Sequence, residues 1–367
     1  MDVRRCLVAI VATGCVALTP AGSARVARDA PAGVTVIGVI PSAVGPITGA
    51  AQDGRFLYVS GYSSMSIYDT FQPTAPELLA VRPSPHMIYG ELLSTDGEIL
   101  LLNAGFIGPT LDVWNVEDKS NPVLAGTVEG LSDEHVSCLL ECTWAYGSDG
   151  SVIDLRDPTA PDLTDTNWKI EAGIGLRRTH RVDEFRQGFM ATAPRSGPPL
   201  VMDVRRPLKP RVVASAKVPR IVPNLFLYTE WANGGRDRFM ISSTENAGCS
   251  SQHQGALVTF DTQGWPDDDS FELLDSYKYR GRTDSDDDSC QAYYFSLHPD
   301  FDDGGLALLP NALEGTRIIE IDGEGQIEEV DSFVLPHSNV WLAFWAAEDI
   351  IYALNQTGEI YVLGYEE

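Results

Sequence analysis

The segment Ser151-Val-Ile-Asp-Leu-Arg-Asp-Pro-Thr-Ala-Pro161 joins a short apolar strand to an acid and then to a turn with two prolines. Close copies of this phrase span Ile67–Pro76 and Val201–Pro210, and Trp114–Pro122 keeps the turn with asparagine in place of the acid. With three fainter copies, the acid and its equivalents are Asp69, Asn115, Asp154, Asp203, Asp261, Glu320 and Tyr361. Successive copies lie 39 to 59 residues apart. Seven units of this length predict an all-β fold, a seven-bladed β-propeller.

The phrase has a simple physical basis. Its Val, Ile and Leu residues suit a strand that is buried between neighbouring sheets. The Asp or Asn can accept a hydrogen bond from the backbone N–H two residues later, which starts a turn. Each proline fixes φ and prevents the strand from continuing. One such unit cannot bury its own faces, whereas units packed side by side can.

The two ends of the predicted domain both contain strand-like sequence. Residues 34–40 are rich in Val and Ile and have no preceding unit, and Glu359–Gly364 is the last apolar run. Pairing these segments in one blade would remove an exposed sheet edge. We therefore expect residues 34–367 to form a single seven-bladed β-propeller domain, closed by the pairing of the N-terminal and C-terminal strands.

Composition narrows the class of partner. The chain has 367 residues, 44% of them hydrophobic, which is enough for a full core. Its formal net charge is −26 at pH 7. Phosphate binding needs a basic face, so nucleic acid is not expected as a partner. Beyond the N-terminal leader, we expect no transmembrane segment.

The N-terminus resembles an export signal. Met1–Arg5 is charged, Cys6–Leu18 is apolar, and Ala21–Ala24 is a zone of small residues. This pattern predicts a signal peptide over residues 1–24 and a secreted, extracellular protein. A lipid-anchored surface form, modified at Cys15, is the alternative, but the apolar run continues past that cysteine.

Removal of the leader leaves four cysteines, an even number in an oxidising compartment. The preferred pairing is Cys138 with Cys142 and Cys249 with Cys290. The second bridge would close a loop of about forty residues and stabilise the fold by roughly 3–4 kcal/mol. The C-x₃-C spacing could also suit zinc, but no second cysteine pair lies nearby.

Four histidines hold a comparable place, each opening the predicted first strand of a repeat: His86, His135, His180 and His337. The fifth repeat has Asn224 there, and the sixth has Tyr293 or Tyr294. First strands line the channel of a propeller, so these side chains are expected to converge at one mouth. Neutral imidazoles could bind a divalent transition metal there, with carboxylates from Glu134 and Glu245. A structural ring of histidines bonded to water and backbone is the favoured alternative, because no ligand pair has a diagnostic spacing.

Several segments resemble the LVIVD-repeat family, in particular its secreted actinobacterial members. They are Glu134–Tyr146 with the following Gly147–Pro158, and Gly315–Ile321 with Arg317. The resemblance extends over about residues 34–363 and implies a β-propeller, but it supplies no biochemical activity. The fifth and sixth repeats depart from the pattern, because they lack the proline turn and the first-strand histidine.

No nucleophile elbow, metalloprotease or nucleotide-binding motif occurs in a suitable context. The sequence therefore predicts a secreted binding or cell-surface interaction protein whose ligand, a protein or a small molecule, binds at the channel mouth with the histidines. The alternative is a metal-dependent, oxidoreductase-like enzyme with a His-lined site at that mouth.

Overall fold

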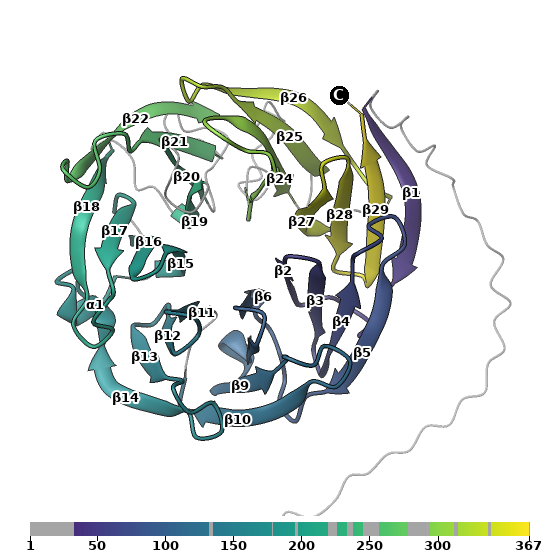
Figure 1. The fold of residues 1–367 in the computed structure, drawn as a ribbon, viewed down its shortest axis with the longest axis horizontal. Helices are drawn as coiled ribbons and strands as arrows, with labels where there is room; N and C mark the ends of the chain where they lie inside the picture. The colour runs from purple at the N-terminus through teal and green to yellow at the C-terminus, as the bar shows by residue number, and fades with distance from the viewer. Residues whose placement is uncertain are drawn as a thin grey trace, which may run out of the picture.

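Short sheets arranged in a ring make up most of the described chain (Figure 1). The computed structural model describes residues 33–131, 135–177, 179–194, 197–218, 226–232, 238–244, 257–277, 292, 294–311, 315–336 and 339–366. Within these ranges, strands pair into sheets in the manner expected of a β-propeller, and no helix is long and apolar enough to cross a membrane.

Most strands lie in antiparallel sets of four, which are numbered here along the chain. One eight-stranded sheet joins two such sets through a parallel pairing of Ser215–Lys217 with Ser270–Glu272. Set 1 consists of β2 (Gly49–Asp53), β3 (Phe56–Gly61), β4 (Ser64–Asp69) and β5 (Glu77–Pro83). Set 2 consists of β7 (Ser94–Thr95), β8 (Ile99–Asn103), β9 (Thr110–Asn115) and β10 (Val123–Glu129). Set 3 consists of β11 (Val136–Leu139), β12 (Trp144–Gly147), β13 (Ser151–Asp154) and β14 (Asp162–Asn167). Set 4 consists of β15 (Thr179–Arg186), β16 (Phe189–Pro194), β17 (Leu200–Asp203) and β18 (Arg211–Lys217).

The remaining sets follow the same plan. Set 5 consists of β19 (Phe226–Trp231), β20 (Phe239–Thr244), β21 (Leu257–Asp261) and β22 (Ser270–Tyr277). Set 6 consists of β23 (Ser296–Leu297), β24 (Gly305–Asn311), β25 (Gly315–Ile321) and β26 (Ile327–Phe333). Set 7 consists of β27 (Val340–Ala347), β28 (Ile350–Asn355), β29 (Glu359–Tyr365) and β1 (Val34–Pro41). Among the described residues, the short elements outside the sets are β6 (Glu91–Leu92), the 3-10 helix η1 (Gly105–Ile107) and α1 (Trp168–Glu171).

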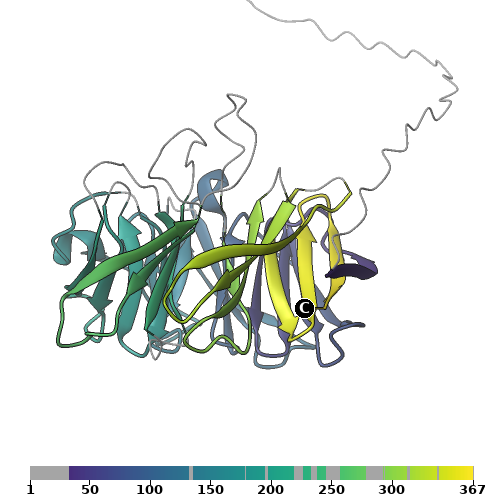
Figure 2. The same ribbon diagram turned by 90° about the horizontal axis from the view of Figure 1, so that it is seen from above.

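The ring closes by pairing the two ends of the described chain. β1 pairs antiparallel with β29, from Val34 opposite Tyr365 to Pro41 opposite Glu359. The predicted pairing of the N-terminal and C-terminal strands is therefore confirmed. The side view in Figure 2 shows the sheets standing next to one another around the ring.

The acid of the repeat phrase makes the predicted turn. Its side-chain oxygen accepts the backbone N–H two residues later at Asp69, Asn115, Asp154, Asp203 and Asp261. In the sixth repeat the assignment of this place to Glu320 is wrong. β25 continues to Ile321, and Asp322 accepts the N–H of Glu324 instead. The strand is longer there, so the turn begins two residues later.

The proline turn also joins neighbouring sets. The buried hydroxyl of Tyr352, on β28, donates to the carbonyl of Pro73, in the turn after β4, at 2.7 Å. Tyr146, on β12, donates in the same way to the carbonyl of Pro207, in the turn after β17. The phrase that ends a strand in one set therefore provides a hydrogen-bond acceptor for the preceding set in the ring.

Apolar side chains fill the space between sets. Met240 and Phe260 of set 5, for example, belong to the same buried cluster as Ala191 and Val201 of set 4. All four are fully buried. Full burial of a Val, Met or Phe side chain stabilises the fold by about 1.5–3 kcal/mol relative to exposure, so the contacts between sets contribute to the stability of the ring.

Candidate ligand and metal sites in the central channel

Two of the predicted histidines meet at the N-terminal ends of innermost strands. His135 directly precedes β11, and His180 is the second residue of β15. Their ring centroids are 4.3 Å apart. His135 is buried and His180 is partly exposed. The predicted convergence therefore holds for this pair, which joins set 3 to set 4.

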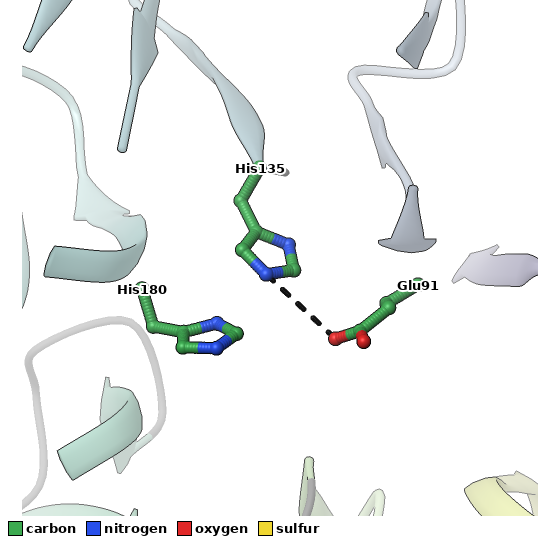
Figure 3. Close-up of side chains that lie close together, drawn as sticks. All are labelled: Glu91, His135 and His180. Atoms are coloured by element: carbon green, nitrogen blue, oxygen red, sulfur yellow. Dashed lines mark ion pairs between the residues drawn. The ribbon is translucent and has the colours of Figure 1, made fainter. Parts of the chain in front are cut away.

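A carboxylate from a third place faces the pair. Glu91 begins β6, and its Oε2 lies 3.7 Å from Nε2 of His135 (Figure 3). Each of the three residues offers a ligand atom, and these atoms all lie within 4.8 Å of one another. The cluster therefore combines two imidazoles and one carboxylate.

The backbone holds Glu91 in an unusual position. Its φ is +47°, in the left-handed region that side-chain-bearing residues seldom adopt. β6 pairs in parallel with β2, with Glu91 opposite Gly49. A Cβ on Gly49 would lie 2.6 Å from the Glu91 carbonyl oxygen, so the approach requires glycine there. The position of the carboxylate is thus set by a contact with another sheet.

Tyr294 completes the group from the sixth repeat. Its hydroxyl donates to Glu91 Oε2 at 2.9 Å and lies 3.5 Å from Nδ1 of His135. The sequence pattern placed Tyr293 or Tyr294 at this position. Glu91 was missed, because neither its left-handed backbone nor the pairing of a two-residue strand leaves a sequence signal.

His86 does not open an innermost strand, and its prediction as a member of the cluster is wrong. β5 ends at Pro83, and β6 begins only at Glu91. In the intervening segment, Nδ1 of His86 lies 2.8 Å from Oδ1 of Asp112, on β9. The histidine therefore forms a polar contact away from the cluster.

Cys138 and Cys142 form a disulfide, as predicted. The bridge spans the turn after β11, in which Leu140, Glu141 and Cys142 all have left-handed backbone. Other predicted positions lie outside the described residues: His337, Glu134, Asn224, Glu245, Cys249, Cys290, Tyr293 and the leader, residues 1–24. Their proposed roles, and the second disulfide, stay predictions.

A cavity of about 420 Å³ lies further along the innermost strands. Every set contributes to its wall, for example through Gln52, Ser94, Cys138, Arg181, Glu230, Ser296 and Phe344. Six acidic residues line it: Asp53, Asp96, Glu141, Asp183, Glu184 and Glu230. Among the described lining residues, Arg181 is the one cation. The cavity is therefore strongly acidic and occupies the centre of the ring.

Arg181 connects the cavity to the cluster. Its buried guanidinium donates to the carbonyl oxygens of Leu92 and Leu93, the two residues after Glu91. These bonds cross from β15 to the chain at β6 and β7. The cation thus lies against the segment that carries Glu91.

Burial changes the acidity of the cavity wall. It raises the pKa of Asp183 to about 6, although the nearby charge of Arg181 acts in the opposite direction. Burial also raises the pKa of Glu184, against hydrogen bonds from the backbone N–H groups of Gly188 and Leu140. Desolvation likewise raises the pKa of Asp53, opposed by Lys119. A positive ligand would therefore find carboxylates whose charge water stabilises poorly.

Comparison with known proteins defines the fold. No family model matches the chain, and no curated protein matches its sequence. By structure, 1203 chains match, so the fold is common and does little to narrow the function. One is a chain in the crystal structure of a mitotic checkpoint complex, with 9% sequence identity, 100% of both chains covered and a TM-score of 0.60. Together with the sheet order, this likeness shows that the chain is a β-propeller.

Proposed function

We propose that the protein is an exported binding protein that takes a small organic cation, such as a di- or polyamine, into its acid-lined channel. The main support for this proposal is the cavity of about 420 Å³, whose described lining includes six acidic residues and one basic residue, Arg181. Ligand pockets for small molecules have volumes of roughly 300–1,000 Å³. The size therefore suits a small molecule, and the charge selects its class.

The electrostatics favour an ammonium ligand over an anion. The guanidinium of Arg181 already donates to two backbone carbonyls. An anion would have to approach six acidic groups for one cation that is already engaged. An ammonium group can instead donate charge-assisted hydrogen bonds to the carboxylates. The net charge of −26 would also attract cations over a longer range.

Export and family membership are part of the proposal. The charged, apolar and small-residue zones of residues 1–24 support export, as does the disulfide between Cys138 and Cys142. The repeat phrase supports an LVIVD-type propeller. The β-propeller fold is consistent with a binding role. An enzymatic role, the alternative from the sequence, depends on whether the cluster around His135 holds a metal.

The test is calorimetric titration of the chain lacking its predicted leader with 1,4-diaminobutane and with spermidine at low salt. We expect saturable binding that weakens as salt is raised. Asp183→Asn and Glu184→Gln should each weaken it about tenfold, because a hydrogen bond to a charged group contributes roughly 1.5–3 kcal/mol. The matched control is Asp162→Asn on β14, an exposed acid outside the cavity wall.

Two results would contradict the proposal. One is the absence of saturable binding for either amine at millimolar concentration. The other is equal weakening by Asp183→Asn and Asp162→Asn, which would indicate attraction to the overall charge and no specific site. Binding of an anion in preference to both amines would assign the cavity to another class of ligand.

A further inference from the structure

We propose that Glu91, His135 and His180 form a mononuclear site for a divalent transition-metal ion of the Zn²⁺ class. The site is separate from the proposed amine-binding cavity and goes beyond that function. Its three ligands come from the start of β6 and from the N-terminal ends of β11 and β15. An ion there would link three parts of the ring that are far apart in sequence.

The geometry is close to what a metal requires. Zn–N bonds of about 2.0–2.1 Å and Zn–O bonds of about 2.0–2.2 Å place the ligand atoms of a tetrahedral site about 3.3 Å apart. The distance between Glu91 Oε2 and His135 Nε2 is 3.7 Å, and all three ligand atoms lie within 4.8 Å of one another. Small side-chain rotations would bring the three atoms to bonding distance of one ion.

The donor types select the kind of metal. Two imidazoles with one carboxylate suit zinc, iron, copper or nickel, whereas calcium and magnesium prefer oxygen ligands. His135 is 2% exposed, so a charge placed against it is poorly screened by water. The carboxylate of Glu91 would offset part of the ion's charge. A transition metal is therefore favoured over a hard cation.

The surroundings hold the carboxylate in place. The hydroxyl of Tyr294 donates to Glu91 Oε2, the same oxygen that faces His135. Such hydrogen bonds to ligating groups fix their orientation and typically change metal affinity 10–100-fold when removed. The backbone at Glu91 is held by its pairing with β2 and, just beyond, by Arg181. The cluster thus has both ligands and a positioning residue.

The competing interpretation is an internal polar contact, in which His135 and Glu91 form an ion pair without metal. The two differ in the role of His180. A metal site needs its imidazole as a ligand, whereas the Glu91–His135 pair does not. Substitution of His180 therefore separates the interpretations without removing the buried His135, whose loss could prevent folding.

The experiment uses the chain without its predicted leader, treated with chelator, dialysed and titrated with Zn²⁺ or Co²⁺ against a chromophoric competitor. We expect one equivalent to bind. His180→Ala and Glu91→Gln should each lower affinity at least about 100-fold. His86→Ala, which removes a histidine paired with Asp112, is the matched control and should bind as the unaltered protein does. Tyr294→Phe should lower affinity about tenfold and alter the Co²⁺ absorption spectrum.

Thermal unfolding shows whether each variant is folded. Each variant should unfold cooperatively without metal, and Zn²⁺ should raise the Tm of the unaltered protein and His86→Ala but not that of Glu91→Gln. Failure of the unaltered protein to bind one equivalent would overturn the proposal. Unchanged affinity in a folded His180→Ala variant would do the same and would favour the ion pair.

Discussion

Replacing Tyr352 with phenylalanine should weaken the closure of the ring. Tyr352 lies on β28 of set 7, and its hydroxyl donates to the carbonyl oxygen of Pro73 in set 1. The side chain is fully buried. The phenyl ring of Tyr352→Phe keeps the apolar contacts and removes only the donor, so the variant isolates one hydrogen bond between the two sets.

The expected loss follows from what the variant leaves behind. A typical hydrogen bond contributes about 0.5–1.5 kcal/mol net, but a buried group left without its partner costs about 1–3 kcal/mol. The variant removes the hydroxyl donor but leaves the Pro73 carbonyl oxygen without its partner. The cost of an unpaired buried group, the larger of the two ranges, therefore applies. We therefore expect Tyr352→Phe to lower the free energy of unfolding by about 1–3 kcal/mol.

Urea unfolding followed by tryptophan fluorescence measures this change. Tyr62→Phe is the control, because Tyr62 is 45% exposed and should tolerate the loss of its hydroxyl with little change. Tyr146→Phe, which removes the equivalent bond to Pro207, should resemble Tyr352→Phe. If both buried variants unfold within about 0.3 kcal/mol of the control, the proline turn does not join neighbouring sets energetically, and the reasoning fails.

Two further predictions concern charge and covalent links. The pKa of Asp183 is raised to about 6, so its protonated form is favoured in the folded state. Its contribution to stability is complete below the unfolded pKa and is lost as pH rises through about 6. Asp183→Asn should therefore raise the free energy of unfolding at pH 7, by up to about 3 kcal/mol, and change it little at pH 4, as urea titrations at the two pH values would show. Peptide mapping without reduction should find Cys138 joined to Cys142 and, as the sequence predicts, Cys249 joined to Cys290. A free thiol at any of the four would contradict the pairing, and Cys138→Ser with Cys142→Ser should cost about 2 kcal/mol because the closed loop is short.

Repetition explains why the fold could be predicted from the sequence. The acid of the phrase makes the same local hydrogen bond at Asp69, Asp154 and Asp203, so one pattern predicts one turn wherever it occurs. The closure of β1 on β29 could also be predicted, because the N-terminal strand begins no repeat of its own and β29 would otherwise leave one edge of its sheet exposed. Glu320 was misassigned because the length of β25 is set by its pairing with β24 and β26, which the phrase does not encode.

The candidate site depends on contacts that occur in one repeat only and that the repeat pattern therefore does not predict. His135 and His180 were predicted because they keep a common place at the start of innermost strands. His86 has a similar sequence place, but β5 ends at Pro83, and four residues after His86, Met87 to Gly90, precede the strand that carries Glu91. The position of Glu91 depends on a glycine opposite it in another sheet and on left-handed backbone. Neither can be inferred from the spacing of one repeat.

Residues that recur in the repeats stabilise the ring, whereas residues that differ between repeats recognise the ligand. The bonds from Tyr146 and Tyr352 to proline turns lie between sets and occur in equivalent places. His135, His180 and Tyr294 lie at the starts of innermost strands or just before them, and Glu91 begins β6, so the repeats contribute two histidines, a tyrosine and a glutamate to this place. Substitutions in the phrase should therefore lower stability and leave ligand and metal affinity in the folded protein unchanged. Substitutions at the strand starts should lower ligand or metal affinity and leave the free energy of unfolding nearly unchanged. The reason is that contacts common to the repeats hold the ring together, whereas side chains that differ between repeats line the channel.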